Sequence, residues 1–469
     1  MIVSGWADGV TLIDFIAREA LLFATVGIAL GGIDDLAVDF AFFIRTGWQR
    51  VVRRRTTPAM LADFAAPQPM GRIAIFVAAW DEADVIGPML DTALARIDYP
   101  DYRIYVGTYP NDPATVAAVA AVAVRDDRVR LVIGTDPGPT TKAGNLNTIW
   151  RTLADDERSD GIRARAIVLH DAEDVVHAKE LRIFDRLIGP YSAVQLPVLP
   201  MVQHGSRLVS GHYCDEFAEA HAKQLVVRQL LGVGLPLAGV GCAISREALD
   251  AVAASRQGDP FDAQSLTEDY ELGLHIAALG GRSILARVHE RAGGPLIAVR
   301  AYFPATLDAA VRQKARWMVG IALAGWDRIG WGNRFALGDH WMRMRDRRGP
   351  IAVVVLAAAY LTLVASALSW LAHAALDVPT LPLAIPIPVL IADAALLIWR
   401  LGMRFGFTAA AYGWREGLWS VPRALVGNII ALLAARRAIM RYLAMLNGAP
   451  IRWDKTAHAF PVLERLQPR

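Results

Sequence analysis

Short hydrophobic runs alternate with longer amphipathic stretches through the middle of the chain, between residues 70 and 300. The runs have the composition of buried strands, and they cover residues 73–77, 102–106, 129–133, 167–170, 194–202 and 283–288. Stretches with helical periodicity lie between them, at residues 85–97, 114–124, 144 onward, 213–232 and 268–279. Such an alternation of strands and helices is typical of a parallel sheet with crossover helices. We therefore predict an α/β domain with a mostly parallel sheet.

Apolar stretches near both ends of the chain predict membrane helices. Residues 12–33, 351–376 and 381–399 are mostly apolar, and a span needs about 20 such residues. Because Asp14 and Glu19 interrupt the first stretch, a buried core helix is the alternative interpretation there. The other two stretches predict a pair of spans with a short connection on the outside.

Arginines beside these stretches orient them in the membrane. A basic cluster between residues 45 and 55 marks the cytoplasmic side by the positive-inside rule. The N-terminus is then outside, and residues 34–48 form an amphipathic helix at the interface. A further apolar run at 425–435 is followed by more arginines, which a crossing would place outside. We therefore predict an interfacial or re-entrant helix over residues 414–442.

These patterns divide the chain into six parts. Their bounds are 1–45 for N-terminal transmembrane and interfacial helices, 46–69 for a basic linker with prolines, 70–300 for the cytoplasmic α/β domain, 301–348 for interfacial helices, 349–400 for two transmembrane helices, and 401–469 for an interfacial helix and a cytoplasmic tail. The 49 basic and 46 acidic residues give a net charge of +3, too balanced for nucleic acid to be a partner. The two cysteines are too few for a disulfide framework and fit a reducing compartment.

Three acids follow the strand at residues 167–170: Asp171, Glu173 and Asp174. In an open α/β sheet, ligands bind outside the carboxyl ends of the strands. Hard cations such as Mg²⁺ take oxygen ligands and share them with substrate phosphates. Asp171 and Glu173 are therefore candidate ligands of a metal that holds a pyrophosphate. An acidic turn at a helix N-terminus is the alternative interpretation.

Two later motifs carry polar chemistry on predicted helices. Thr267, Glu268 and Asp269 open the helix at 268–279, where the alternative interpretation is a capped N-terminus. The motif at 313–317 places a glutamine, an arginine and a tryptophan at i, i+3 and i+4, on one helix face. Such a face lines a polar pocket or, alternatively, belongs to an amphipathic helix with an interfacial tryptophan.

The ordered set of motifs between residues 70 and 320 resembles the membrane-bound family 2 glycosyltransferases, which include the cellulose, chitin and hyaluronan synthases. The matching segments are 79–82, 111–112, 142–147, 171–173, 239–242, 267–269 and 313–317. Segments 109–115, 170–174 and 453–461 resemble the bacterial phage-adsorption protein B family more closely, and this resemblance covers nearly the whole chain. Two positions depart from the usual pattern: Glu173 stands where Asp is more common, and Cys242 where a hydroxyl residue is common.

The resemblance implies a Rossmann-like glycosyltransferase A fold that binds a UDP-sugar. It implies that acidic side chains hold the uridine and that a lysine lies near the base or the diphosphate: Asp81, Glu82, Asp112 and Lys142. It further implies that Asp171 and Glu173 bind Mg²⁺ or Mn²⁺.

The resemblance also implies the catalytic and acceptor-binding residues. Glu268 and Asp269 would be catalytic, with Asp269 as the general base. Arg316 would pair with the pyrophosphate, because guanidinium geometry suits phosphate oxygens, and Trp317 would stack on the acceptor sugar. The other substrate-binding residues that it implies are Gln313, Gly241 and Cys242.

In function, the resemblance implies an inverting glycosyltransferase of the bacterial inner membrane, multi-pass, with its catalytic domain in the cytoplasm. The enzyme would transfer an N-acetylhexosamine from a UDP-sugar to a growing polysaccharide for exopolysaccharide secretion. Its expected partners are the lipid bilayer, a glycan acceptor, an outer-membrane exporter and a cyclic-di-GMP-binding regulator, whose module is either absent here or a separate chain. Two alternatives stay open: a non-enzymatic membrane scaffold or phage-receptor component, and a single-transfer, lipid-linked glycosyltransferase.

Overall fold

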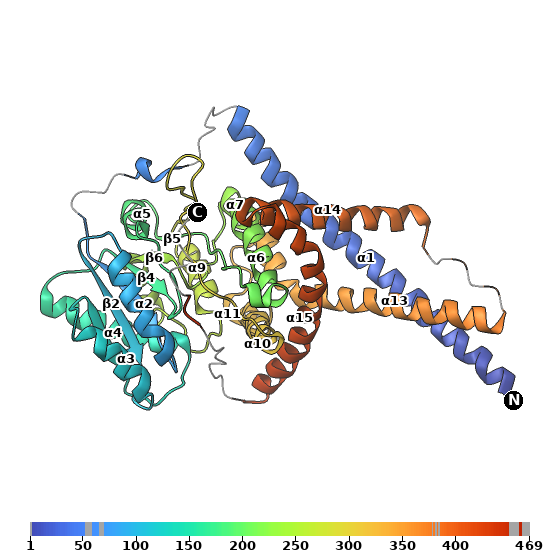
Figure 1. Cartoon of the computed structure of the whole chain (residues 1–469), viewed down its shortest axis with the longest axis horizontal. Helices are drawn as coiled ribbons and strands as arrows, with labels where there is room; N and C mark the ends of the chain where they lie inside the picture. The colour runs from blue at the N-terminus through green and yellow to red at the C-terminus, as the bar shows by residue number, and fades with distance from the viewer. Residues whose placement is uncertain are drawn as a thin grey trace.

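A mixed, mostly parallel sheet is the centre of the α/β domain (Figure 1). The computed structural model describes residues 2–51, 59–64, 70–377, 379, 382, 385–449 and 459–461. Its strands are β1 (Ile73–Ala78), β2 (Tyr102–Thr108), β3 (Val129–Ile133), β4 (Ala166–His170), β5 (Ala193–Gln195), β6 (Cys242–Ser245) and β7 (Ser283–Leu285). They follow the order β3-β2-β1-β4-β6-β5-β7, and of these strands β6 alone runs antiparallel to its neighbours. The predicted mostly parallel sheet is confirmed.

Helices cover both faces of this sheet. One face packs against α2 (Ala83–Arg96), α3 (Pro113–Ala123) and α5 (Glu180–Leu187), and the other against α4 (Lys142–Asp160), α8 (Arg246–Ser255) and α9 (Glu268–Ala278). Successive residues of β1 alternate between the two cores: Ile73 and Ile75 enter the first, Ala74 and Phe76 the second. Because both faces are buried, the strands are continuous hydrophobic runs in the sequence.

The antiparallel strand β6 brings one more segment to the edge where ligands bind. Cys242, the first residue of β6, pairs with Leu169 near the carboxyl end of β4. The segment that precedes Cys242 therefore lies at the same edge as the loops that follow β1, β4 and β5. This edge is the usual ligand site of open α/β sheets.

A helical layer joins the sheet domain to the membrane part. In it, α6 (Val209–Glu219) passes through the π-helical turn η3 (Ala220–Gln224) into α7 (Leu225–Leu230). Likewise α10 (Leu307–Trp317) passes through the π-helical turn η4 (Met318–Leu323) into α11 (Ala324–Ile329). The remaining short elements are α12 (Leu337–Arg347) and the 3₁₀ turns η1 (Leu61–Asp63) and η2 (His204–Ser206). The predicted helix at 213–232 thus begins earlier, at Val209.

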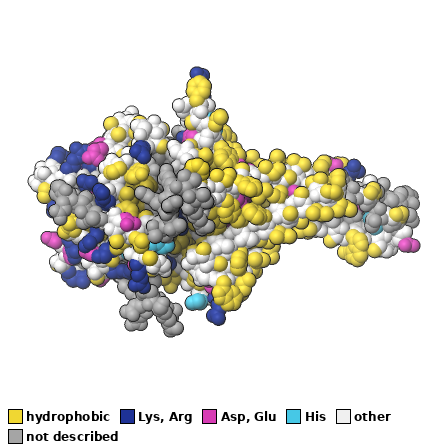
Figure 2. Space-filling view, turned by 90° about the horizontal axis from the view of Figure 1, so that it is seen from above, with side chains coloured by type: hydrophobic (Ala, Val, Ile, Leu, Met, Phe, Trp, Pro, Cys, Tyr) yellow, Lys and Arg dark blue, Asp and Glu magenta, His cyan; other side chains and the backbone are white. Residues whose placement is uncertain are grey.

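Three long helices project together from the domain: α1 (Ile2–Val51), α13 (Gly349–Leu376) and α14 (Ile387–Tyr412) (Figure 1). Hydrophobic side chains cover this projection, whereas charged side chains gather over the α/β domain (Figure 2). α15 (Trp414–Leu446) curves across the base of the projection and packs its apolar side against α6 and α10.

Among the described residues, three helices are long and apolar enough to cross a membrane: Gly9–Gln49, Gly349–Leu376 and Trp414–Leu446. This set differs from our prediction at α14, which we expected to span, and at α15, which we expected to be interfacial. Figure 1 nevertheless shows α14 projecting together with α1 and α13, with α15 at the base of the projection, and α14 packs against α1. The interfacial placement of α15 stays a prediction. Residues 453–458 of the predicted motif at 453–461, and the arginines at 53–55, lie outside the described residues.

The predicted division of the N-terminal region into a span and a separate interfacial helix is wrong, because α1 is one continuous helix. Asp34 and Asp35, which we predicted to begin the interfacial helix, pair with arginines of the membrane-proximal helices. Arg345 lies 2.9 Å from Asp35, and Arg348 lies 2.5 Å from Asp34. These charges are therefore neutralised at the base of the helix bundle, and the helix continues past them.

Candidate active site

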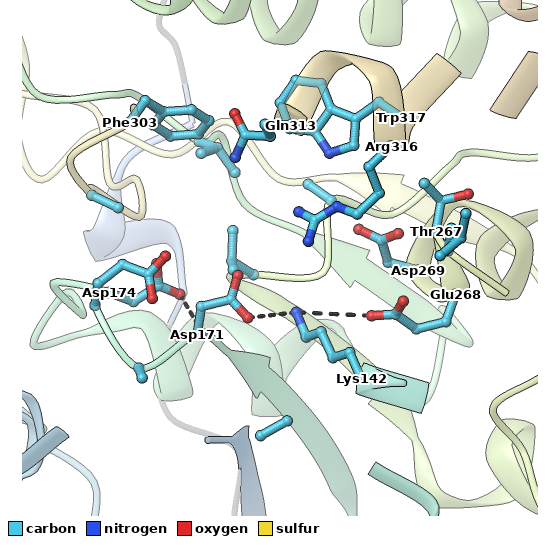
Figure 3. A pocket seen from close by; sticks show the side chains of 18 of the residues that line it. Lys142, Asp171, Asp174, Thr267, Glu268, Asp269, Phe303, Gln313, Arg316 and Trp317 are labelled. Atoms are coloured by element: carbon cyan, nitrogen blue, oxygen red, sulfur yellow. Dashed lines mark hydrogen bonds and ion pairs between the residues drawn. The ribbon is translucent and has the colours of Figure 1, made fainter. Parts of the chain in front are cut away.

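A cavity opens at the carboxyl edge of the sheet, between the strand ends and α10 (Figure 3). Most of the predicted site residues line it: Glu82, Lys142, Asp171, Glu173, Glu268, Asp269, Gln313, Arg316 and Trp317. In Figure 3, Asp171, Lys142 and Glu268 lie along one side, and Gln313 and Trp317 along the other. Arg316 and Asp269 lie between the two sides. Residues far apart in the sequence thus meet in one hollow.

The acidic turn after β4 is held by a buried histidine. His170 Nδ1 lies 2.9 Å from Asp174 and its Nε2 lies 2.8 Å from Glu180. Burial alone would lower the pKa of His170, but the carboxylates of Glu180 and Asp174 outweigh it and raise that pKa to about 10. The same Asp174 oxygen accepts the backbone N–H of Asp171 at 3.0 Å. The turn that carries Asp171 and Glu173 is therefore tied to the end of its strand.

Lys142 connects the acidic turn to the start of α9. It is the first residue of α4, where the Thr141 hydroxyl caps the helix by accepting the Gly144 N–H at 3.1 Å. The Lys142 ammonium lies 2.5 Å from Asp171 and 3.8 Å from Glu268. Burial would lower the pKa of Lys142, yet these carboxylates raise it above its usual range. Lys142 therefore stays charged and attracts anionic groups to this side of the cavity.

Asp269 has the electrostatic environment of a general base. Burial, together with the neighbouring Glu268 carboxylate, raises the pKa of Asp269 to about 7, although Lys142 acts in the opposite direction. Two glycines allow close packing around this turn. A Cβ on Gly239, which has a φ of +72°, would lie 2.6 Å from Asp269 Oδ2, and one on Gly320 would lie 2.5 Å from Thr267 Oγ1. The surrounding backbone therefore restricts the position of the Asp269 carboxylate.

The side of the cavity that α10 forms is aromatic. Trp317 has its ring centroid 6.0 Å from that of Tyr213 and 6.2 Å from that of Phe217. Phe303 packs 4.9 Å from Phe217, also between ring centroids. These rings present flat apolar surface beside the polar groups, which is the arrangement that sugar rings contact well.

Two of the α10 residues that line the cavity each have a buried polar atom without a hydrogen-bond partner among the described residues, namely Arg316 Nε and Gln313 Oε1. Buried polar groups are normally paired. Because both residues line the cavity, their unpaired atoms fit a polar ligand there.

Four predicted site residues do not line the cavity: Asp81, Asp112, Gly241 and Cys242. Asp112 is the N-cap of α3, and its carboxylate accepts the N–H of Thr115 at 3.2 Å and that of Asp81 at 2.6 Å. It thereby holds Asp81 at a positive φ of 54°. Direct contact of these two acids with uridine stays a prediction.

The expected acceptor contact of Gly241 and Cys242 is corrected by their positions. Cys242 has no exposed surface and packs in the core behind β6, where burial raises its thiol pKa above the usual range. Gly241 has a φ of +55°, and a Cβ there would lie 2.1 Å from Val299. The residues of this loop that line the cavity are instead Ala238 and Val240.

The family of the chain follows from comparison with known proteins. The family model described as "Glycosyltransferase like family 2" matches residues 69–320, which is more than half of the chain and contains this cavity's motifs. The chain belongs to glycosyltransferase family 2. It is 35% identical to bacteriophage adsorption protein B of Escherichia coli K12, and equally to bacteriophage N4 adsorption protein B of Escherichia coli O157:H7. Each match covers 92% of this chain and 60% of the relative, so the chain spans less than two thirds of their length.

One solved structure of another protein resembles this chain in fold. The mannosyltransferase of Pyrobaculum calidifontis, in complex with GDP-Man and Mn²⁺, is 18% identical, with a TM-score of 0.53. The superposition covers 89% of this chain and 99% of that one. The predicted glycosyltransferase A fold with a membrane part is confirmed at the level of architecture.

Several residues that line the cavity were not predicted from the sequence. Phe217, Phe303 and Val198 line it, although they come from segments to which no motif pointed. The aromatic sequence 302–303, directly before the N-cap Thr306 of α10, was the one available signal. Phe217 gave none, because an aromatic residue on an amphipathic helix is more often part of a core.

The carboxylates at the acidic turn fit a divalent metal only together with a ligand. Asp171 and Glu173 offer hard oxygen donors to one cavity, and Asp171 already attracts the Lys142 cation. The described residues contain no cluster of three or more His, Cys, Asp or Glu that could hold a metal. Mg²⁺ and similar ions typically bind one or two carboxylates plus substrate phosphates. The donor set therefore fits a metal that arrives with a diphosphate.

Proposed function

We propose that this chain is an inverting glycosyltransferase that uses a nucleotide-diphosphate sugar. The observation that carries the proposal is the single cavity shared by Asp171, Glu173, Arg316 and Asp269. Carboxylates for a metal, a guanidinium for phosphate and a carboxylate with a pKa near 7 are the groups that this transfer needs. A non-enzymatic scaffold has no use for such a set.

Donor binding falls to the charged side of the cavity. Asp171 and Glu173 would hold Mg²⁺ or Mn²⁺, which when bound offsets the negative charge of the diphosphate. Lys142 adds positive charge from the charged side and Arg316 from between the two sides. Arg316 Nε, which has no hydrogen-bond partner among the described residues, is available for a phosphate oxygen. We take the donor to be a UDP-sugar from the family resemblance, and the GDP-Man of the structural neighbour makes a guanosine donor the competing choice.

Asp269 carries the proton transfer. The acceptor hydroxyl gives its proton to the Asp269 carboxylate while its oxygen forms a bond to the anomeric carbon. The bond from that carbon to the diphosphate breaks at the same time, and the nucleoside diphosphate leaves with the bonding electrons. A single displacement of this kind needs one base and inverts the anomeric configuration.

The acceptor side and the cellular setting complete the proposal. Trp317 would stack on the terminal sugar of a growing polysaccharide, with an N-acetylhexosamine as the unit added. The long apolar helices support a location in a membrane. We take this to be the bacterial inner membrane from the family resemblance, with the catalytic domain in the cytoplasm by the positive-inside rule. An outer-membrane exporter and a cyclic-di-GMP-binding regulator would be its partners. A lipid-linked acceptor that receives one sugar is the competing product.

The test is nucleoside-diphosphate release from donors by the full chain in lipid nanodiscs. The panel contains UDP-N-acetylglucosamine, UDP-N-acetylmannosamine, UDP-glucose and GDP-mannose, each with Mg²⁺ or Mn²⁺. Asp269→Asn is expected to lower turnover by about 10³-fold while donor affinity stays near that of the wild type. The matched control is Asp308→Asn, which removes an exposed carboxylate on α10. Absence of release with every donor contradicts the proposal, and wild-type turnover by Asp269→Asn contradicts the base assignment.

A further inference from the structure

A buried cluster of titratable side chains lies at the base of the acidic turn, and one of its members, Asp174, also lines the cavity. It consists of His170 at the end of β4, Asp174 within the turn and Glu180 at the start of α5. Their side chains expose 0%, 2% and 0% of their surface, respectively. His170 and Glu180 do not line the cavity, so neither one contacts a ligand there.

His170 is held at both of its ring nitrogens. Nδ1 lies 2.9 Å from Asp174 and Nε2 lies 2.8 Å from Glu180. A buried polar group that loses its hydrogen-bond partner costs free energy, because no water replaces the partner. The two contacts therefore hold the ring, Asp174 and Glu180 in one arrangement.

Both carboxylates also hold the backbone of the turn. Asp174 accepts the N–H of Asp171 at 3.0 Å, and the Asp174 N–H donates to the Asp171 carbonyl at 3.2 Å. Glu180 uses its second oxygen to accept the N–H of His177 at 3.0 Å. The two ends of the segment 171–177 are thus anchored to one histidine, and Glu173 lies between the anchors.

We propose that His170 and Glu180 are positioning residues, which hold the Asp171–Glu173 carboxylates in the geometry that a divalent cation requires. The proposal rests on the proposed function, because the metal belongs to the donor site described above. The physical reason is that hard cations need oxygen ligands within tenths of an ångström, whereas a short turn is mobile without anchors. Groups that orient metal ligands typically change metal affinity by 10- to 100-fold when they are replaced.

The chain offers a matched control on the same helix. Asp185 on α5 has a fully buried side chain and pairs with Arg165 at 2.8 Å. Replacing Asp185 removes a buried ion-pair partner, as replacing Glu180 does. The partners of Asp185, however, lie outside the segment 171–177. Asp185→Asn therefore separates a general loss of stability from a specific loss of turn geometry.

The experiment measures Mn²⁺ binding by electron paramagnetic resonance with the full chain in nanodiscs, with UDP or GDP present. His170→Gln and Glu180→Gln are expected to weaken Mn²⁺ binding by at least about tenfold. Asp185→Asn is expected to lower the melting temperature with unchanged Mn²⁺ affinity. Wild-type affinity in both cluster variants, or an equal loss in Asp185→Asn, overturns the proposal.

A second measurement does not depend on the metal. Hydrogen exchange at the Asp171 and His177 amides is expected to accelerate in His170→Gln and Glu180→Gln but not in Asp185→Asn. Unchanged exchange in the cluster variants overturns the anchoring itself. If the wild type binds no Mn²⁺ with either nucleotide while exchange behaves as expected, the proposed function fails and the anchoring stands.

Discussion

The two sides of the cavity are built in different ways. The charged side, with Lys142, Asp171 and Glu268, comes from the turn after β4 and the first residues of α4 and α9, and it is held by ion pairs. The aromatic side, with Phe217, Phe303 and Trp317, comes from the helical layer beside the membrane part and is held by ring packing. The α/β domain thus fixes the positions of the charged groups. The elements that contact α15 fix the positions of the aromatic rings.

This difference indicates a division of labour. Charged groups in a partly buried cavity interact strongly with phosphates and little with neutral sugars. Aromatic faces give smaller energies that depend on contact area. The charged side therefore suits the donor, and the aromatic side suits a neutral acceptor that must move after each transfer. Substitutions on the two sides should differ both in size of effect and in the substrate affected.

The largest effect is expected from the charged side. Asp171→Asn should lower kcat/KM by about 10³-fold, because it removes a carboxylate for the metal and leaves Lys142 without its nearest partner. Mn²⁺-dependent nucleotide release is the measurement. Asp91→Asn, on the exposed part of α2, is the control and should behave as the wild type. A loss smaller than that of an aromatic-side variant contradicts the division.

A smaller effect is expected from the aromatic side. Trp317→Ala should raise the KM for the acceptor by roughly tenfold to thirtyfold, because it removes the stacking surface. Donor affinity should not change, and Trp317→Phe should recover part of the loss. The control is Trp326→Ala, because Trp326 is 40% exposed and does not line the cavity. A changed donor affinity with an unchanged acceptor KM would reverse the assignment.

The pH dependence sharpens the role of the group between the two sides. A base must be deprotonated to act, and the pKa of Asp269 is about 7 because of burial and Glu268. The protonated, inactive form therefore dominates below pH 7, and activity rises with pH to a plateau above it. At pH 6, kcat/KM should be about tenfold below the plateau. A flat profile between pH 5.5 and 8 contradicts this role.

The smallest effect is expected at Cys242, which we predicted to contact the acceptor but which is fully buried. Cys242→Ser places a hydroxyl in the apolar core behind β6, which should lower the free energy of unfolding by about 1–2 kcal/mol. Activity at low temperature should stay within about twofold of the wild type. Thermal unfolding and nucleotide release check the two parts. A raised acceptor KM with unchanged stability would restore the original prediction.

The sequence predicted the site best where a polar motif directly follows an apolar strand or has the spacing of one helix face. The strands around Asp171 are continuous apolar runs. The acids directly after β4 lie at the carboxyl end of a strand, where open α/β sheets bind ligands. The motif at 313–317 could be placed on one helix face by its spacing alone. By contrast, the sequence did not show that Asp112 caps α3, since an acid before a helix has the same pattern as a cap and as a ligand.

The sequence by itself determined the elements, their order and the identity of the polar groups, because local periodicity and strand-end chemistry are written in neighbouring residues. Only the tertiary structure decided which groups share the cavity. The antiparallel β6 brought Ala238 and Val240 to the sheet edge and buried Cys242. Likewise, packing of α6 on α10 placed Phe217 beside Trp317. Strand direction and helix packing depend on contacts between distant residues, and no local pattern contains them.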